Sequence, residues 1–151
     1  MKIIPLNNEE ATRSGFTHKF IIPYTDLNDK TSGTAFVIYP SLAGSATGLT
    51  AGFRVGDLAY NVATAFTLSG GGTLVFSCGD AGDAARYVAA STDLLTAGYG
   101  ESALTKKPYT LPAAASIRLT VTVATSTMAQ ISAGSLEIYA NITNLAQYTG
   151  Q

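Results

Sequence analysis

Residues 58–68 have the sequence Leu-Ala-Tyr-Asn-Val-Ala-Thr-Ala-Phe-Thr-Leu, and this stretch decides the fold. One set of alternate positions is Leu58, Tyr60, Val62, Thr64, Phe66 and Leu68, and the other is Ala59, Asn61, Ala63, Ala65 and Thr67. The larger side chains thus recur at every second residue. A period of two belongs to a β-strand, whose successive side chains point to opposite faces of the sheet, whereas an amphipathic helix has a period of about 3.6. We therefore predict a long strand.

Two later stretches show the same alternation more cleanly. Ile117, Leu119, Val121 and Val123 alternate with Arg118, Thr120 and Thr122; Leu136, Ile138, Ala140 and Ile142 alternate with Glu137, Tyr139 and Asn141. Each pattern predicts a strand with one apolar face toward a core and one polar face toward solvent.

Further strands are expected at residues 16–22, before Pro23, and at 33–39, before Pro40. Residues 41–52 predict a loop that leads into a short strand at 53–55. The glycines at 70–72 predict the turn of a hairpin between 58–68 and a strand at 73–78. About eight strands and no helix longer than two turns are typical of an antiparallel β-sandwich or barrel.

Length and composition favour one domain with a covered surface. The chain has 151 residues, enough for one core, and only 13% of them are charged, about half the usual share. Residues 1–14 are polar without an apolar period, so we predict an extended amino-terminal arm at 1–14 and a β-sandwich domain at 15–151.

Several classes of function are disfavoured. A net charge of -1 provides no basic patch for nucleic acid, and no apolar stretch approaches the length of about 20 residues needed to span a membrane. We expect neither a nucleic-acid nor a membrane partner, and we expect no export signal after Met1. Cys78 is the only cysteine, so an intrachain disulfide is excluded.

Few residues are suited to chemistry. His18, the only histidine, lies in a predicted strand and is expected to be packed or hydrogen-bonded, and Cys78 is expected to be a small buried apolar residue. The candidates for a metal are Asp80, Asp83 and Asp93, but their spacing is not that of a calcium-binding loop and turn formation explains them as well. Asp26 and Asp29 have the same ambiguity. We predict no catalytic residues, no cofactor and no bound metal.

The strand order also resembles a known class of proteins. The alternating strand at 59–68, the glycine turn, the strand at 73–76 and the sequence Gly79-Asp80-Ala81-Gly82-Asp83 are followed by Tyr87, by Thr92-Asp93-Leu94 and by a closing pair of strands at 117–125 and 133–139. This order resembles that of small virion proteins of tailed bacteriophages, over residues 52–143.

The resemblance implies a capsid cement or decoration protein with a jelly-roll core. Such proteins are commonly trimers that sit over junctions between subunits of the major capsid protein. The expected partners are therefore the major capsid protein and further copies of this chain, and the expected location is the capsid surface of the virion, after synthesis in the host cytoplasm.

Two other classes of function remain open from the sequence. A lectin-like or receptor-binding head or tail-fibre module of the same fold would present Tyr24, Tyr99 and Tyr109 to a glycan, although the chain lacks tryptophan. An enzyme or metal-dependent hydrolase would have to use His18 or Asp83, and we expect no such activity.

Overall fold

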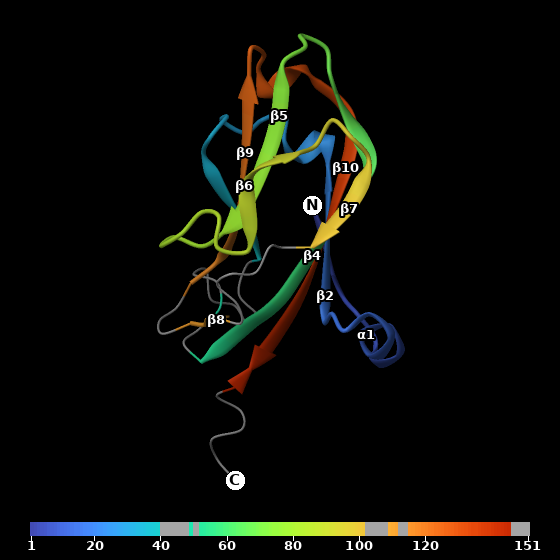
Figure 1. Ribbon diagram of the computed structural model, residues 1–151, viewed down its shortest axis with the longest axis vertical. Helices are drawn as coiled ribbons and strands as arrows, with labels where there is room; N and C mark the ends of the chain where they lie inside the picture. Colours follow the sequence, from blue (N-terminus) through green and yellow to red (C-terminus); the bar gives the residue numbers. More distant parts are fainter. Residues whose placement is uncertain (40–48, 50–51, 102–108, 112–114, 146–151) are drawn as a thin grey trace.

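Two antiparallel β-sheets packed face to face make up the protein (Figure 1). The computed structural model describes residues 1–39, 49, 52–101, 109–111 and 115–145. The first sheet has six strands, with β1, β2, β10, β4 and β7 side by side and β8 also paired with β4. The second sheet has four strands in the order β3, β9, β5, β6. The prediction of an all-β sandwich is confirmed.

The strands of the first sheet are β1 (Lys2–Pro5), β2 (His18–Pro23), β4 (Phe53–Leu68), β7 (Gly98–Glu101), β8 (Tyr109–Thr110) and β10 (Ile131–Asn144). Those of the second sheet are β3 (Ala35–Tyr39), β5 (Thr73–Gly79), β6 (Val88–Asp93) and β9 (Ile117–Ala124). Short helical segments are α1 (Asn8–Ser14), η1 (Tyr24–Asp26) and η2 (Met128–Gln130). Among the described residues, no helix has the length and apolarity required to cross a membrane.

The strand pairing is that of a jelly roll. β2 pairs with β10, β3 with β9, β4 with β7 and β5 with β6, so that the pairs are nested within one another along the chain. Two sheets result when strands of neighbouring pairs also pair with each other. β10 does so with β4 in the first sheet, and β9 does so with β5 in the second.

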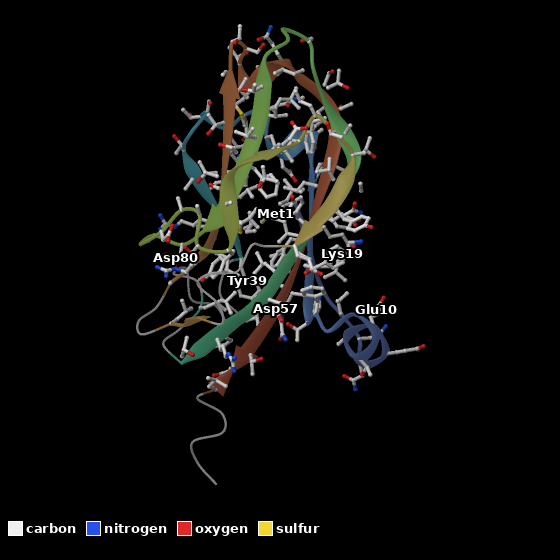
Figure 2. All side chains as sticks on the ribbon, in the orientation of Figure 1. Met1, Glu10, Lys19, Tyr39, Asp57 and Asp80 are labelled. Carbon is white, nitrogen blue, oxygen red and sulfur yellow. The ribbon has the colours of Figure 1, made fainter. Side chains whose placement is uncertain are left out.

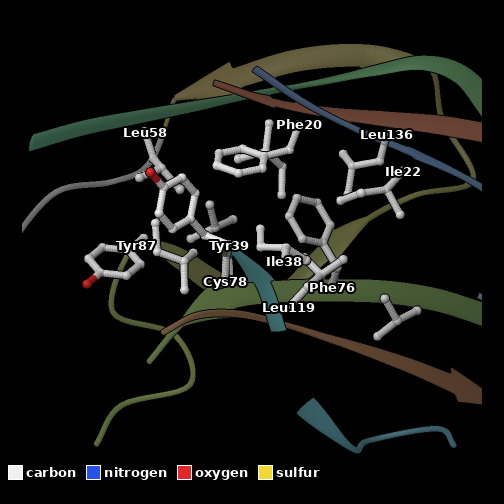
Figure 3. Packing of buried hydrophobic residues seen from close by; sticks show 14 of the residues in the cluster. Phe20, Ile22, Ile38, Tyr39, Leu58, Phe76, Cys78, Tyr87, Leu119 and Leu136 are labelled. Atoms are coloured by element: carbon white, nitrogen blue, oxygen red, sulfur yellow. The ribbon is translucent and has the colours of Figure 1, made fainter. Parts of the chain in front are cut away.

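The core fills the space between the two sheets (Figure 3). Phe20, Ile22 and Leu136 approach it from the first sheet, and Phe76 and Leu119 from the second. All five side chains are buried. Between them the ring of Phe20 meets that of Tyr39 edge to face, with 5.7 Å between centroids, a favourable arrangement for aromatic pairs.

The long strand expected at 58–68 is confirmed, and it begins earlier than predicted. The short strand expected at 53–55 is the first part of β4, and the alternation along β4 is interrupted because its pairing with β10 shifts register in several places. At one shift Gly134 has a φ of +122°, and a side chain there would collide with the ring of Phe66. Only glycine fits this position.

The predicted hairpin between 58–68 and 73–78 is wrong. A turn does form at the glycines, but β4 belongs to the first sheet and β5 to the second, so the turn carries the chain across the sandwich. β5 pairs instead with β9 and β6. A period-two pattern predicts that a segment is a strand but not which strand it pairs with. Three flexible glycines allow either a hairpin turn within one sheet or a turn that crosses to the other sheet.

The extended arm expected at 1–14 contains one strand and one helix. β1 pairs antiparallel with β2, from Lys2 opposite Ile21 to Pro5 opposite His18. α1 begins with a capping box, in which the Asn7 side chain accepts from the backbone N–H of Glu10 and the Glu10 carboxylate accepts from that of Asn7. Four strand residues and seven helical residues are too few to show a clear apolar period. The loop predicted at 41–52 lies mostly outside the described residues.

Candidate functional site

Asp80 lies in the loop after β5 and has a structural role (Figure 2). Its Oδ1 accepts hydrogen bonds from the backbone N–H groups of Gly82, at 2.8 Å, and Asp83, at 2.9 Å. Its Oδ2 lies 2.5 Å from Nε of Arg86. Asp80 is 6% exposed, and its carboxylate holds this loop together through these bonds.

The structure does not bring the acidic candidates together. Oδ1 of Asp83 accepts from the backbone N–H of Ala85, and Oδ1 of Asp93, at the end of β6, accepts from that of Leu95. Both are the short-range contacts of turn residues. Within the described ranges, no three histidine, cysteine, aspartate or glutamate side chains gather into a group that could hold a metal ion.

Asp26 and Asp29, the other acidic candidates, each form an ion pair. Asp26 forms an ion pair with the amino group of Met1, and Asp29 lies 2.6 Å from Nζ of Lys30. The hydrogen bond from Lys30 lowers the pKa of Asp29.

His18 packs at the edge of the core. Its Nδ1 lies 2.8 Å from Oγ1 of Thr17, and its ring meets Tyr39 edge to face at 5.4 Å. Burial lowers the pKa of His18, because a charged imidazole loses hydration there. Burial also raises the pKa of Tyr39 to about 12. Cys78 is buried among apolar side chains.

The outer face of the first sheet carries the most distinctive surface feature. Two rows of side chains cross this face: Lys19, Tyr139, Ala59 and Glu101, and beside them Ile21, Glu137, Asn61 and Tyr99. Lys19 points away from the second sheet (Figure 2). A hollow of about 240 Å³ lies on this face, and we call it the aromatic hollow. It is lined by Phe16, Ala59, Tyr60, Asn61, Tyr99, Gly100, Glu101 and Tyr139.

Hydrogen bonds fix one wall of the aromatic hollow. The Tyr139 hydroxyl donates to Oε2 of Glu137 at 2.7 Å, the Asn61 amide donates to the same oxygen at 3.3 Å, and Nζ of Lys19 lies 2.7 Å from Oε1. Burial alone would raise the pKa of Glu137, but these three bonds outweigh it and lower the pKa. Nζ of Lys19 also lies 5.2 Å from the centre of the Tyr139 ring.

A second hollow, of about 260 Å³, lies beside the edge strand β3. It is lined by Met1, Thr25, Asp26, Asp29, Lys30, Phe36 and Val37. The large hydrophobic residues exposed among the described ones are Met1, Val37 and Tyr99, at 45%, 43% and 89%. Met1 and Val37 line this hollow, and Tyr99 lines the aromatic hollow.

A third hollow, of about 270 Å³, follows the irregular pairing of β4 with β10. Asp57, whose position is marked in Figure 2, lines it together with Arg54, Asn141 and Thr143. Its described lining also includes Gly56 and Leu145 and holds no aromatic ring.

Of the tyrosines considered for a glycan, the structure places only Tyr99 freely on the surface. Tyr24 is partly buried and packs against the core, and the side chain of Tyr109 lies outside the described part. The sequence did not indicate the companions of Tyr99, which are Phe16, Asn61, Glu101 and Tyr139. The alternating patterns at 58–68 and 136–142 predicted that Asn61 and Tyr139 lie on the faces opposite the larger apolar side chains. Only the strand order shows that these two residues lie beside each other and beside Tyr99.

Comparison with known proteins gives one match. No family model and no curated protein matches the chain. A solved structure described as "Cyanophage Pam1 capsid asymmetric unit" contains a chain that is 17% identical, with a TM-score of 0.49. The match covers 81% of this chain and 79% of that one. A similarity this distant supports no conclusion about function.

Proposed function

We propose that this protein is a structural component of a tailed-bacteriophage virion. It binds the outside of the capsid as a cement or decoration protein, contacts the major capsid protein, associates as a homotrimer and stabilises the shell. It acts there without catalysis, after synthesis in the host cytoplasm. The proposal starts from the order of strands and the glycine-aspartate turn in residues 52–143, which resemble those of small phage virion proteins.

The observation that carries the proposal is the edge strand β3. Its sequence, Ala-Phe-Val-Ile-Tyr, contains no charge and no proline, and Val37 is 43% exposed at its middle. An apolar edge strand is a hazard for a free protein, because it can pair with any other exposed strand. An assembly that covers the edge removes this hazard, so the strand supports a role in which the protein is held by neighbours.

The low charge of the chain supports the same role. Only 13% of residues are charged, and Met1 and Val37, which with Tyr99 are the exposed large hydrophobic residues among those described, line one hollow beside β3. A protein that contacts several subunits at once needs only weak contacts at each, because linked contacts strengthen one another.

We also propose that residues 1–14 act as a separate contact element attached to the sandwich domain of residues 15–151. α1 protrudes from the side of the sandwich (Figure 1), and the first turn of α1 carries Glu9 and Glu10. A projecting acidic turn is suited to a basic patch on a neighbouring subunit.

Binding to capsids tests the proposal. Capsids of the parent phage that lack this protein are mixed with the purified chain, sedimented and analysed for bound protein and for resistance to heat. We expect stoichiometric retention, a higher temperature of capsid disruption and a trimer in analytical ultracentrifugation. A chain that stays in the supernatant, with capsid stability unchanged, would contradict the proposal.

A further inference from the structure

The aromatic hollow combines exposed rings with polar groups in one shallow site. Its rings come from different parts of the chain: Phe16 precedes β2, Tyr99 lies on β7 and Tyr139 lies on β10. Ala59 on the intervening strand β4 is too small to fill the space between them. We propose that this hollow is a binding site for an uncharged sugar ring.

Tyr99 provides the surface on which such a ring would stack. Its side chain is 89% exposed, far more than any other large hydrophobic residue among those described. Exposed aromatic surface is costly in water, and the C–H face of a pyranose covers it while leaving the sugar hydroxyls at the rim.

The opposite wall is held in place before a ligand arrives. The Tyr139 ring is fixed by the bond from its hydroxyl to Glu137, by Lys19 near its face and by Phe16, whose ring centre lies 5.9 Å away. Glu137 likewise fixes the amide of Asn61. A preorganised wall reduces the entropy lost on binding.

The rim offers hydrogen bonds of the kind that hydroxyl groups satisfy. Oδ1 of Asn61, the Tyr99 hydroxyl and the Glu101 carboxylate have no partner among the described residues. Sugar hydroxyls both donate and accept, so they match this mixture of groups. An apolar protein side chain in the same place would bury these groups unpaired, which is unfavourable.

The charge of the lining and the size of the hollow further restrict the kind of ligand that can bind. The described lining has one ionisable acid, Glu101, and no cationic side chain, and the nearby Lys19 is paired with Glu137. Phosphorylated, sulfated or sialylated ligands would meet a carboxylate without a compensating cation, so a neutral sugar is favoured. A volume of about 240 Å³ accommodates a single ring of an oligosaccharide rather than a larger ligand.

This site does not depend on the proposed capsid role. It lies on the outer face of the first sheet, whereas the edge strand β3 belongs to the second sheet. A substitution in one is therefore expected to leave the other unchanged.

Saturation-transfer difference NMR on the full chain tests the site. The probes are the neutral tetrasaccharides maltotetraose, cellotetraose, mannotetraose and chitotetraose, with sialyllactose and a heparin-derived tetrasaccharide as charged comparisons. We expect at least one neutral probe to bind and neither charged one. Tyr99→Ala should raise the Kd by about tenfold or more, while Tyr99→Phe, which keeps the ring, should have a smaller effect.

Val37→Ala, at the other exposed apolar site, is the matched control and should leave the Kd unchanged. The inference is overturned if none of the neutral probes binds, if the charged probes bind in preference, or if Tyr99→Ala leaves the Kd unchanged. It is also overturned if Tyr99→Ala converts an oligomer into monomers in light scattering, since a second copy would then cover the hollow. Retention of Tyr99→Ala on capsids reports separately on the proposed function.

Discussion

Asp80 shows how a single buried residue fixes a loop in this fold. Its carboxylate bonds to two backbone N–H groups and to Arg86, and these contacts shape residues 80–86 between β5 and β6. The sequence placed a turn here correctly, because glycine and aspartate favour turns. It did not indicate the arginine partner, since the side-chain geometry depends on how the loop folds back.

Asp80→Ala should lower the free energy of unfolding by about 2 to 3 kcal/mol, because the backbone N–H groups of Gly82 and Asp83 lose their acceptor and Arg86 loses its ion-pair partner. Urea unfolding followed by circular dichroism measures this loss. Asp93→Ala is the matched control, since Asp93 is exposed and its carboxylate accepts one turn hydrogen bond, from the backbone N–H of Leu95, and the loss of stability should be clearly smaller. Equal losses would show that the Asp80 contacts do not stabilise the loop.

His18 should make stability depend on pH. Burial lowers its pKa below 6.5, so the unfolded chain binds the proton more readily than the folded one. The free energy of unfolding should therefore be highest above pH 6.5 and fall as the pH is lowered through the pKa of the folded state. His18→Gln should remove this part of the dependence between pH 7.5 and pH 5.5.

The single histidine also allows a direct measurement of the pKa by NMR. A titration midpoint at or above 6.5 for the imidazole protons of the folded protein would contradict the structural account of His18.

At the scale of elements, the pairing of β4 with β10 is the centre of the first sheet. Its register shifts allow a long strand to curve over the core, and Gly134 permits one of them. Alternation alone located both strands, but it could not show the shifts, because these depend on close packing across the pair.

Gly134→Ala should destabilise the fold by about 2 to 4 kcal/mol, because φ is positive there and the new methyl group would meet the Phe66 ring. Gly98→Ala is the control, since nothing lies within 4 Å of a Cβ at that position. Thermal unfolding of both variants decides the matter, and a melting temperature for Gly134→Ala equal to that of Gly98→Ala would refute the expectation.

The exposed apolar residue Val37 on the edge strand β3 allows a second test at the level of single elements. Val37→Lys places a charge on the exposed apolar edge and should reduce retention on capsids by about tenfold, with little change in the melting temperature. Val37→Thr keeps the shape and the strand propensity and should retain more binding. Unchanged retention of Val37→Lys would show that the edge is not a contact surface.

The sequence predicted the strands better than their arrangement. Residues with a clear period, such as 117–123 and 136–142, were assigned correctly, whereas the brief β1 and α1 were missed. Neighbours in the sheets were not predictable from pattern, as the false hairpin between β4 and β5 shows. The aromatic hollow was missed for the same reason, because its rings meet only through strand order.

For the whole molecule, the nested pairing makes the fold depend on distant segments. Leu136 of β10 lies opposite Ile22 of β2 and Val62 of β4. The strand β10 therefore joins two strands that lie far before it in the sequence. Contacts of this kind are slow to form, because long loops must close first.

Two truncations should therefore differ sharply. A chain that ends at residue 130 lacks the strand between β2 and β4 and should not fold. A chain that begins at residue 15 keeps both sheets apart from β1 and should unfold cooperatively in urea, with weaker capsid retention. A folded protein from the first truncation would contradict the central role of β10, and an unfolded one from the second would contradict the domain division.

Because β10 is synthesised after every strand that it joins, the sandwich remains open on the ribosome until translation has passed that strand. Messages cut short before it would yield only chains that lack the strand joining β2 to β4. Synthesis and folding are thus coupled, so that only products carrying the central strand complete the sandwich.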